Sequence, residues 1–329
     1  MATVFIGQDE VADLLPMADC IDAVRRALGA LARGEAVQPL RPVMWLPEKV
    51  GALGMMPGYL GSIDTMGIKT VTVFPGNAGT EYDSHQGTVM LFDAGNGRLK
   101  AVIDATEITA VRTAAASAVA TDLLAREDSS VLAILGAGVQ GHSHARAIPL
   151  VRPIDETRVW SRTPESAARL VANADGNARA VSSIEEAVDG ADIVCTTTAS
   201  PDPILTGALL EEGMHVNAVG SSVPFARELD SEATARSRIF VDRKESTVNE
   251  SGDFIMARED GAVEDDDIVA ELGEIIVGTH AGRGSEEEIT LFISLGIAVE
   301  DIASADLVYR NAVASNRGLT IEFGGARHG

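Results

Sequence analysis

The sequence predicts a two-domain α/β protein in which a doubly wound parallel sheet is joined to a mixed α+β domain. At 329 residues, the chain exceeds the usual size of a single α/β core. Short apolar runs alternate with helical segments over residues 131–242, a pattern typical of a parallel sheet. Residues 39–105 instead alternate apolar runs with turn signals, which predicts a mostly antiparallel sheet.

The first domain is predicted to open with an amphipathic helix over residues 19–33, where apolar residues recur at helical spacing. Its antiparallel region contains Gly-Asn-Gly at residues 95–97 between two apolar runs, which indicates a hairpin. The Ala-rich segment 106–126 predicts a long helix, with Thr106 or a neighbour as its N-cap. We place the domain boundaries so that residues 1–115 and 305–329 form one domain and residues 116–304 form the other.

The second domain is predicted from its regular alternation of apolar runs and helical segments. The expected strands cover residues 131–135, 157–160, 178–181, 191–198, 214–220 and 238–242. Helices are expected directly after the first strand, from Pro164 onward, and over residues 184–188. The chain from Thr290 onward is expected to be helical. Because it is too long to serve only as a cap on the second domain, we expect it to return to the first domain.

The formal net charge of −23 repels phosphate groups and anionic lipids, so nucleic-acid and membrane partners are disfavoured. The N-terminus lacks the features of a secretory signal, and no window of about eighteen residues is continuously apolar. These observations predict a soluble, cytoplasmic protein. Cys20 and Cys195 lie far apart in the sequence and are expected to be free thiols.

A glycine-rich turn follows the first strand of the second domain and opens a helix. In such a turn the first glycine permits a tight bend, the second lets the backbone approach a pyrophosphate, and the third lets helix and strand pack closely. The helix N-terminus then favours the anion. This context predicts a Rossmann-type dinucleotide site and a nicotinamide cofactor, bound by Gly136, Gly138, Val139, Gln140 and Gly141.

The second strand is followed by Ser161, Arg162 and Thr163, where an NAD-specific site usually has an acidic residue. Arg162 with its two neighbours can hold a 2′-phosphate, so NADP(H) is slightly favoured over NAD(H). Alternatively, Arg162 stacks over the adenine and the site accepts both cofactors. Further cofactor-binding candidates are Thr196, Thr197, Val219, Gly220 and Gly296.

Several motifs in the same order resemble the ornithine cyclodeaminase/mu-crystallin family, and the resemblance covers nearly the whole chain. They lie at residues 56–60, 67–70, 74–77, 108–115 and 292–301. The resemblance implies NAD(P)-dependent chemistry on amino or imino acids and a homodimer formed through the non-Rossmann domain. It also implies that residues 1–115 and 305–329 serve substrate binding and dimerisation.

The resemblance implies that Arg41 and Arg112 clamp a substrate carboxylate, a group that the planar guanidinium fork matches well. It places Lys69 at the family's substrate lysine. The nearby arginines are expected to disfavour its ammonium form, which suits proton transfer. His85 is a candidate contact for a second carboxylate, although a structural role is an equal alternative. His142 and His144 face different sides of one helix, and we predict no catalytic metal.

Ser222 lies where ornithine cyclodeaminases carry an aspartate, and a serine cannot replace that carboxylate. We therefore expect reduction of a small, anionic 2-imino acid, such as a ketimine or iminosuccinate, to an L-amino acid, or the reverse dehydrogenation. Ser222 is expected to border the reacting centre, in a closed cleft between the domains. The alternatives are a cyclodeaminase with bound NAD and a non-catalytic, mu-crystallin-like ligand-binding protein.

Overall fold

The computed structural model describes residues 2–77 and 79–323 and divides into two compact units. The first unit comprises Met1–Arg112 and Ile297–Gly329, and the second comprises Thr113–Gly296. The predicted second boundary, after residue 304, is eight residues later than the observed one. The observed boundary lies earlier because the last helix, α11 (Ala298–Ser315), packs along its length against elements of the first unit.

The first unit contains a mixed sheet in the order β16-β1-β7-β6-β5-β4-β2, with β3 also pairing with β4. Neighbours pair antiparallel except β1 and β7, which are parallel. The strands are β1 (Ala2–Ile6), β2 (Ala36–Val37), β3 (Val43–Trp45), β4 (Ala52–Leu60), β5 (Thr65–Val73), β6 (His85–Asp93), β7 (Leu99–Asp104) and β16 (Leu319–Glu322). The predicted hairpin near residue 96 is confirmed as the β6–β7 connection.

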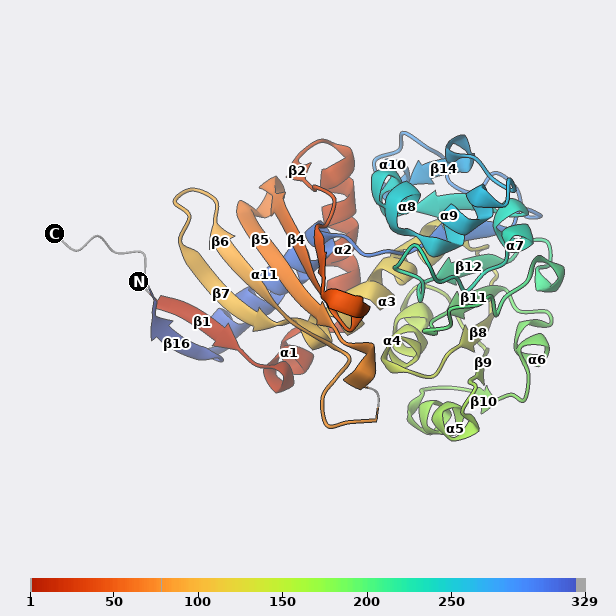
Figure 1. Ribbon diagram of the computed structural model, residues 1–329, viewed down its shortest axis with the longest axis horizontal. Coiled ribbons are helices and arrows are strands. Elements are labelled where there is room, and N and C mark those ends of the chain that lie inside the picture. The colour runs from red at the N-terminus through yellow and green to blue at the C-terminus, as the bar shows by residue number, and fades with distance from the viewer. Residues whose placement is uncertain (1, 78, 324–329) are drawn as a thin grey trace. The chain divides into compact units, whose positions relative to one another are not determined.

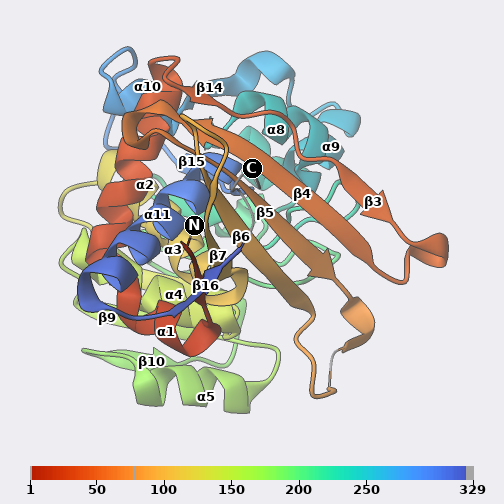
Figure 2. The ribbon, with the colours of Figure 1, turned by 90° about the vertical axis from the view of Figure 1, so that its left-hand side faces the viewer.

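Two helices of the first unit, α2 (Met17–Ala32) and α11, pack together beside the sheet, and α1 (Gln8–Leu14) contacts α11 (Figure 2). Small residues let α11 approach the strands. A Cβ added to Gly67 of β5 would lie 3.1 Å from a carbon of Ile302, and one added to Gly58 of β4 would lie 3.0 Å from the same side chain. The position of α11 therefore depends on glycines in two adjacent strands.

The opposite face of the sheet carries side chains that alternate with the buried ones and remain half-buried. Many of them are large and apolar, among them Tyr59, Met66, Ile68 and Phe92. With neighbouring residues they line an open groove of about 530 Å³. We call this surface, defined by those four residues and Met90, the open sheet face.

The second unit is built around eight parallel strands in the order β10-β9-β8-β11-β12-β15-β13-β14. The chain reverses direction of winding at β8, which lies between β9 and β11, as in a doubly wound dinucleotide-binding sheet. The strands are β8 (Val131–Leu135), β9 (Glu156–Trp160), β10 (Ala178–Ala180), β11 (Ile193–Thr196), β12 (His215–Ala218), β13 (Arg238–Val241), β14 (Ile268–Glu271) and β15 (Thr290–Ile293). The predicted fold class, a Rossmann-type sheet plus a mixed domain, is confirmed.

The helices of the second unit connect these strands (Figure 1). They are α4 (Val139–Ala147), α5 (Pro164–Asn173), α6 (Ile184–Val188), α7 (Ser231–Ala235), α8 (Lys244–Glu250), α9 (Gly252–Glu259) and α10 (Leu272–Ile276). Helix α3 (Ala105–Leu124) contains the first domain boundary, and Asp104 accepts a hydrogen bond from the backbone N–H of Thr106 at its start. No helix in the described ranges is long and apolar enough to cross a membrane.

One predicted element is wrong at its start. The chain from Thr290 onward was expected to be helical, which α11 confirms for residues 298–315, but Thr290–Ile293 forms strand β15, which is buried between β12 and β13. A four-residue run buried on both faces has no alternation, so periodicity cannot separate it from a buried helix turn. Both cysteines are free, as predicted, and both are buried.

Candidate active site

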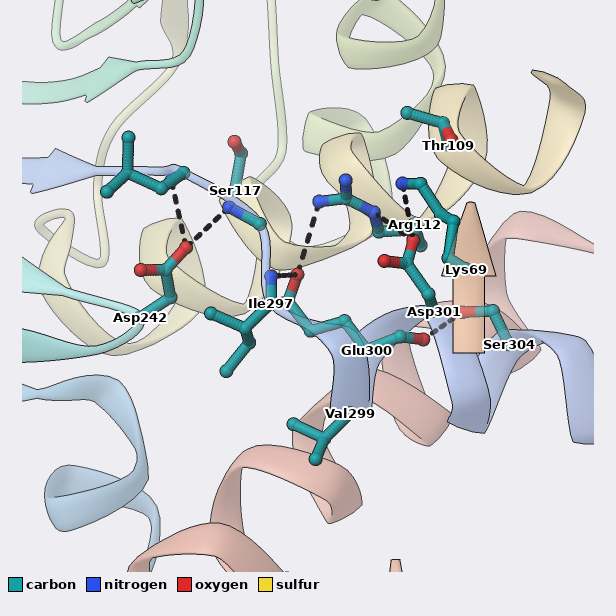
Figure 3. A network of polar contacts seen from close by, with 12 residues as sticks. Lys69, Thr109, Arg112, Ser117, Asp242, Ile297, Val299, Glu300, Asp301 and Ser304 are labelled. Atoms are coloured by element: carbon teal, nitrogen blue, oxygen red, sulfur yellow. Dashed lines mark hydrogen bonds and ion pairs between the residues drawn. The ribbon is translucent and has the colours of Figure 1, made fainter. Parts of the chain in front are cut away.

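Three segments of the first unit bring ionised side chains together around Asp301 (Figure 3). Lys69 Nζ of β5 donates a hydrogen bond to Asp301 Oδ1 over 3.0 Å, and Arg112 Nε of α3 donates to the same oxygen over 2.8 Å. The side chains of Lys69 and Arg112 are 3% and 5% exposed, and that of Asp301 is fully buried. One carboxylate oxygen therefore positions two of the predicted site residues.

A second buried carboxylate belongs to the same cluster. Glu300 Oε2 accepts a hydrogen bond from Arg112 over 3.2 Å and another from the backbone N–H of Ile297 over 3.3 Å. Glu300 and Asp301 occupy the first turn of α11, where the helix dipole favours negative charge. Burial of the two acids is thus offset by cations and by the helix N-terminus.

The pKa of Lys69 is lowered to about 8, mainly by burial; Asp301 opposes the shift, and the charges of Arg112 and Arg41 add to it. From the sequence, such a shift was expected from the arginines alone. Desolvation is instead the largest cause, since the ammonium group has almost no contact with water. With this pKa, Lys69 can gain or lose a proton near neutral pH.

Arg41 and His85 lie within electrostatic reach of Lys69. Arg41 belongs to the irregular segment before β3 and is half-buried, and its charge acts on Lys69. His85, the first residue of β6, is exposed; partial desolvation of its ring lowers its pKa, and the charge of Lys69 lowers it further. Its Nδ1 lies 3.1 Å from the hydroxyl of Ser84. The first unit thus gathers four of the predicted substrate residues.

Glu300 and Asp301 were not among the predicted site residues, although they end one of the motifs that carry the family resemblance. Two adjacent acids at a helix start have a simple alternative role, which is to complement the helix dipole. The sequence did offer one signal for these two acids. The motif ends in two carboxylates, which could pair with the cationic site residues predicted elsewhere in the first domain. Asp301 pairs with Lys69 across 232 residues of sequence, so no local pattern reports the contact.

In the second unit, the glycine turn adopts the geometry expected for a pyrophosphate site. Gly136 has a φ of +118°, and a Cβ there would lie 2.8 Å from the carbonyl oxygen of Thr197. A Cβ on Gly141 would collide with the carbonyl oxygen of Gly136. Gly138 is the N-cap of α4, and Val139 beside it is 66% exposed. The residues therefore fit a dinucleotide phosphate at the α4 N-terminus.

The other predicted cofactor residues follow the carboxyl ends of parallel strands. Ser161, Arg162 and Thr163 follow β9, and the hydroxyl of Ser161 accepts from the N–H of Thr163 over 3.3 Å. Thr196 and Thr197 end or follow β11, Val219 and Gly220 follow β12, and Gly296 follows β15. Because these strands are parallel, all the segments lie along one edge of the sheet, where doubly wound sheets bind ligands.

Ser222 is exposed in the loop that follows β12, two residues beyond Gly220. It belongs to the second unit, whereas Arg41, Lys69, Arg112 and His85 belong to the first. Its proposed place beside the reacting centre stays a prediction.

The described geometry, a buried lysine with arginines in one unit and a dinucleotide-type turn in the other, fits the resemblance seen in the sequence. Residues 1–316 match the ornithine cyclodeaminase/mu-crystallin family. The chain belongs to this family. The predicted family membership is thus confirmed.

Relatives in this family match over nearly their full length. Ketimine reductase mu-crystallin of Mus musculus is 42% identical over 312 residues, which are 94% of this chain and 97% of that protein. The structure of Thermococcus litoralis Δ1-pyrroline-2-carboxylate reductase with NADH and L-proline is 36% identical, with a TM-score of 0.94, covering 96% of this chain and 99% of that one. An archaeal alanine dehydrogenase dimer with bound NAD is 34% identical, with a TM-score of 0.94, covering 98% and 100%.

Removal of the shared carboxylate should destabilise the protein strongly. Asp301→Ala leaves Lys69 and Arg112 buried without their common acceptor, and such a loss typically costs about 3–5 kcal/mol. Urea unfolding measures the change. Val313→Ala on the same helix removes a side chain that is 56% exposed and should change stability by less than about 0.5 kcal/mol. Equal stability of the two variants would show that Asp301 does not support the cluster.

Proposed function

We propose that this protein reduces a small 2-imino acid to an L-amino acid with NADH or NADPH, or catalyses the reverse dehydrogenation. The observation that carries the proposal is the buried Lys69, whose ammonium group lies beside Arg112 on one carboxylate. The reductase and dehydrogenase names of the relatives support it. The predicted cytoplasmic location stays a prediction.

In the proposed reaction, the substrate carboxylate binds Arg41 and Arg112, whose planar guanidinium groups suit it. Two nitrogens of Arg112 already donate to Asp301 and Glu300, and these bonds fix the orientation of the guanidinium. When bound at the glycine turn, a nicotinamide cofactor would supply the hydride that the C=N carbon gains. Lys69 supplies or positions the proton that the imine nitrogen gains, so that the C=N bond becomes CH–NH.

The charges of the cluster support an anionic substrate. Arg41, Lys69 and Arg112 contribute three positive charges, and Glu300 and Asp301 contribute two negative ones, which leaves one positive charge among these five groups. A substrate carboxylate would balance it. His85 remains a candidate for a second substrate acid group.

For the cofactor, we propose a slight preference for NADP(H). Arg162 is exposed after β9, where it can reach a 2′-phosphate, and the neighbouring residues Ser161 and Thr163 carry hydroxyls. The solved relatives described above contain NADH or NAD. Comparing the two cofactors in one assay decides this preference.

Cyclodeamination of ornithine is a weaker alternative, because Ser222 cannot supply the carboxylate expected for that chemistry. A ligand-binding protein without turnover is also weaker, since a buried lysine with a pKa near neutrality has no evident purpose in simple binding.

The proposed reaction can be tested directly by following NADH and NADPH oxidation. The substrates are a cyclic ketimine and, separately, pyruvate, glyoxylate or oxaloacetate with ammonia or methylamine, alongside a test for ammonia release from ornithine. Lys69→Met should lower kcat/KM by about 10²–10⁴-fold, the usual contribution of a proton-transfer group. Lys244→Met, at an exposed lysine of α8, is the matched control. Ammonia release from ornithine without cofactor turnover would contradict the proposal.

The pH profile should report the environment of Lys69. If the protonated lysine is the active form, kcat/KM for imine reduction falls as pH rises above about 8, the pKa of Lys69. Asp301→Asn keeps the shape but removes the charge that raises this pKa, so the decline should begin at lower pH. If kcat/KM of Asp301→Asn declines at the same pH as that of the wild-type protein, or at a higher pH, the proposed role of Lys69 is wrong.

We further propose that the protein forms a homodimer through the open sheet face. The side chains of this surface are large and apolar, and the chain itself covers them only in part. Burying them against a second copy would therefore be favourable. The archaeal relative is described as a dimer.

A charge on the open sheet face should disrupt this dimer. Ile68→Asp places an unpaired carboxylate in an apolar contact, and light scattering after gel filtration should then give the mass of one chain. The control Val313→Asp adds the same charge to an exposed position on α11 and should leave a dimer. A wild-type monomer, or an Ile68→Asp dimer, would contradict the proposed surface.

A further inference from the structure

A buried carboxylate joins the ends of two neighbouring strands in the second unit. The backbone ladder between β11 and β12 ends where the N–H of Val219 donates to the carbonyl of Thr196 over 3.0 Å. Beyond that point, the N–H and hydroxyl of Thr198 both donate to Glu228 Oε1 over 2.6 Å, and the N–H of Gly220 donates to Oε2 over 2.7 Å. Glu228 thus connects the two segments where the ladder stops.

Glu228 is held rigidly by its own backbone. Its N–H and that of Leu229 donate to Asp253 Oδ1 over 2.7 and 2.9 Å, and its carbonyl accepts from Ile204 and Leu205. Asp253 lies in the first turn of α9, and both acids are fully or almost fully buried. Burial raises the pKa of Glu228, but the hydrogen-bond donors directed at its oxygens favour the carboxylate.

The same polar chain reaches the glycine turn. Thr197, adjacent to Thr198, donates its hydroxyl to the carbonyl of Gly136 over 2.9 Å. The connection therefore runs from the turn, through residues 197–198 and Glu228, to Gly220. These are three of the segments proposed to contact the cofactor.

There is little space for these segments to shift. A Cβ on Gly220 would lie 2.6 Å from the carboxyl group of Glu228 and would collide with the carbonyl oxygen of Thr198. The absence of a side chain at residue 220 lets the loop approach the carboxylate closely. An apolar residue at position 228 would leave the N–H groups of Thr198 and Gly220 without this acceptor.

We propose that Glu228 is a positioning residue for the nicotinamide half of the cofactor. The carboxylate fixes the segments after β11 and β12, which lie beyond the glycine turn in the order of the sheet, while the turn itself binds the pyrophosphate. Glu228 acts through Thr198 and Gly220 and does not itself touch the reacting atoms. This inference rests on the proposed nicotinamide-dependent function.

The test compares two ligands, NADH and ADP-ribose, that share every group except the nicotinamide ring. Glu228→Gln keeps the size of the side chain but directs an amide N–H₂ at a backbone donor. The Kd for NADH, measured by titration calorimetry, should rise about tenfold, the effect of one lost hydrogen bond. The Kd for ADP-ribose, which lacks the nicotinamide, should stay within about twofold of the wild-type value.

The matched control is a carboxylate that accepts backbone hydrogen bonds at the opposite end of the same sheet. Asp192 Oδ2 accepts from the N–H groups of Ser130 and Val131 over 2.8 and 3.0 Å, at the amino end of β8. Asp192→Asn should leave the ratio of the two Kd values unchanged. If Glu228→Gln does not fold, as judged by circular dichroism, Thr198→Val removes one bond to the carboxylate and should change the ratio in the same direction.

The results distinguish this inference from the proposed function. If the wild-type protein binds NADH but the ratio is unchanged in Glu228→Gln and in Thr198→Val, Glu228 has only a structural role and the inference is wrong. An equal weakening of NADH and ADP-ribose binding would also show a purely structural role. A wild-type protein that binds neither NADH nor NADPH overturns the proposed function as well.

Discussion

The sharing of Asp301 Oδ1 between Lys69 and Arg112 is the interaction on which the candidate active site depends. Each of these groups would be costly to bury alone, by several kcal/mol per ion. Together they form a cluster in which the lysine keeps a partner while burial still lowers its pKa to about 8. Additional carboxylates beside Lys69 would raise its pKa and keep it protonated. Without any carboxylate, its buried ammonium form would be too costly.

This cluster exists because α11 lies close to the sheet. Gly58 and Gly67 provide the space, since a side chain at either position would press against Ile302 of the helix. The alternation of β5 directs Lys69 to the same side as Gly67, and Glu300 and Asp301 lie on the first turn of α11. Local sequence features therefore set the packing, and the packing sets the electrostatics of the site.

The parallel sheet and its glycine turn could be predicted from the sequence because their signals are local. An apolar run, glycines at fixed spacing and a helix start all lie within residues 131–147. Lys69 and Arg112 could be selected only because their surrounding motifs resemble a family. Asp301 and Glu228 could not be recognised, since their partners are distant in sequence or are backbone groups of other loops. Strand β15 was mistaken for helix because burial on both faces removes alternation.

The first unit is assembled from both ends of the chain, with β1 pairing antiparallel to β16 and α11 packed beside β4 and β5. During synthesis on the ribosome, the whole second unit emerges before α11 does, because it is encoded between the two parts of the first. A nascent chain that has not reached residue 301 exposes Lys69 and Arg112 without their acid. On the ribosome, the ion cluster therefore cannot form until α11 has been synthesised, and premature termination anywhere before α11 yields a chain without this site.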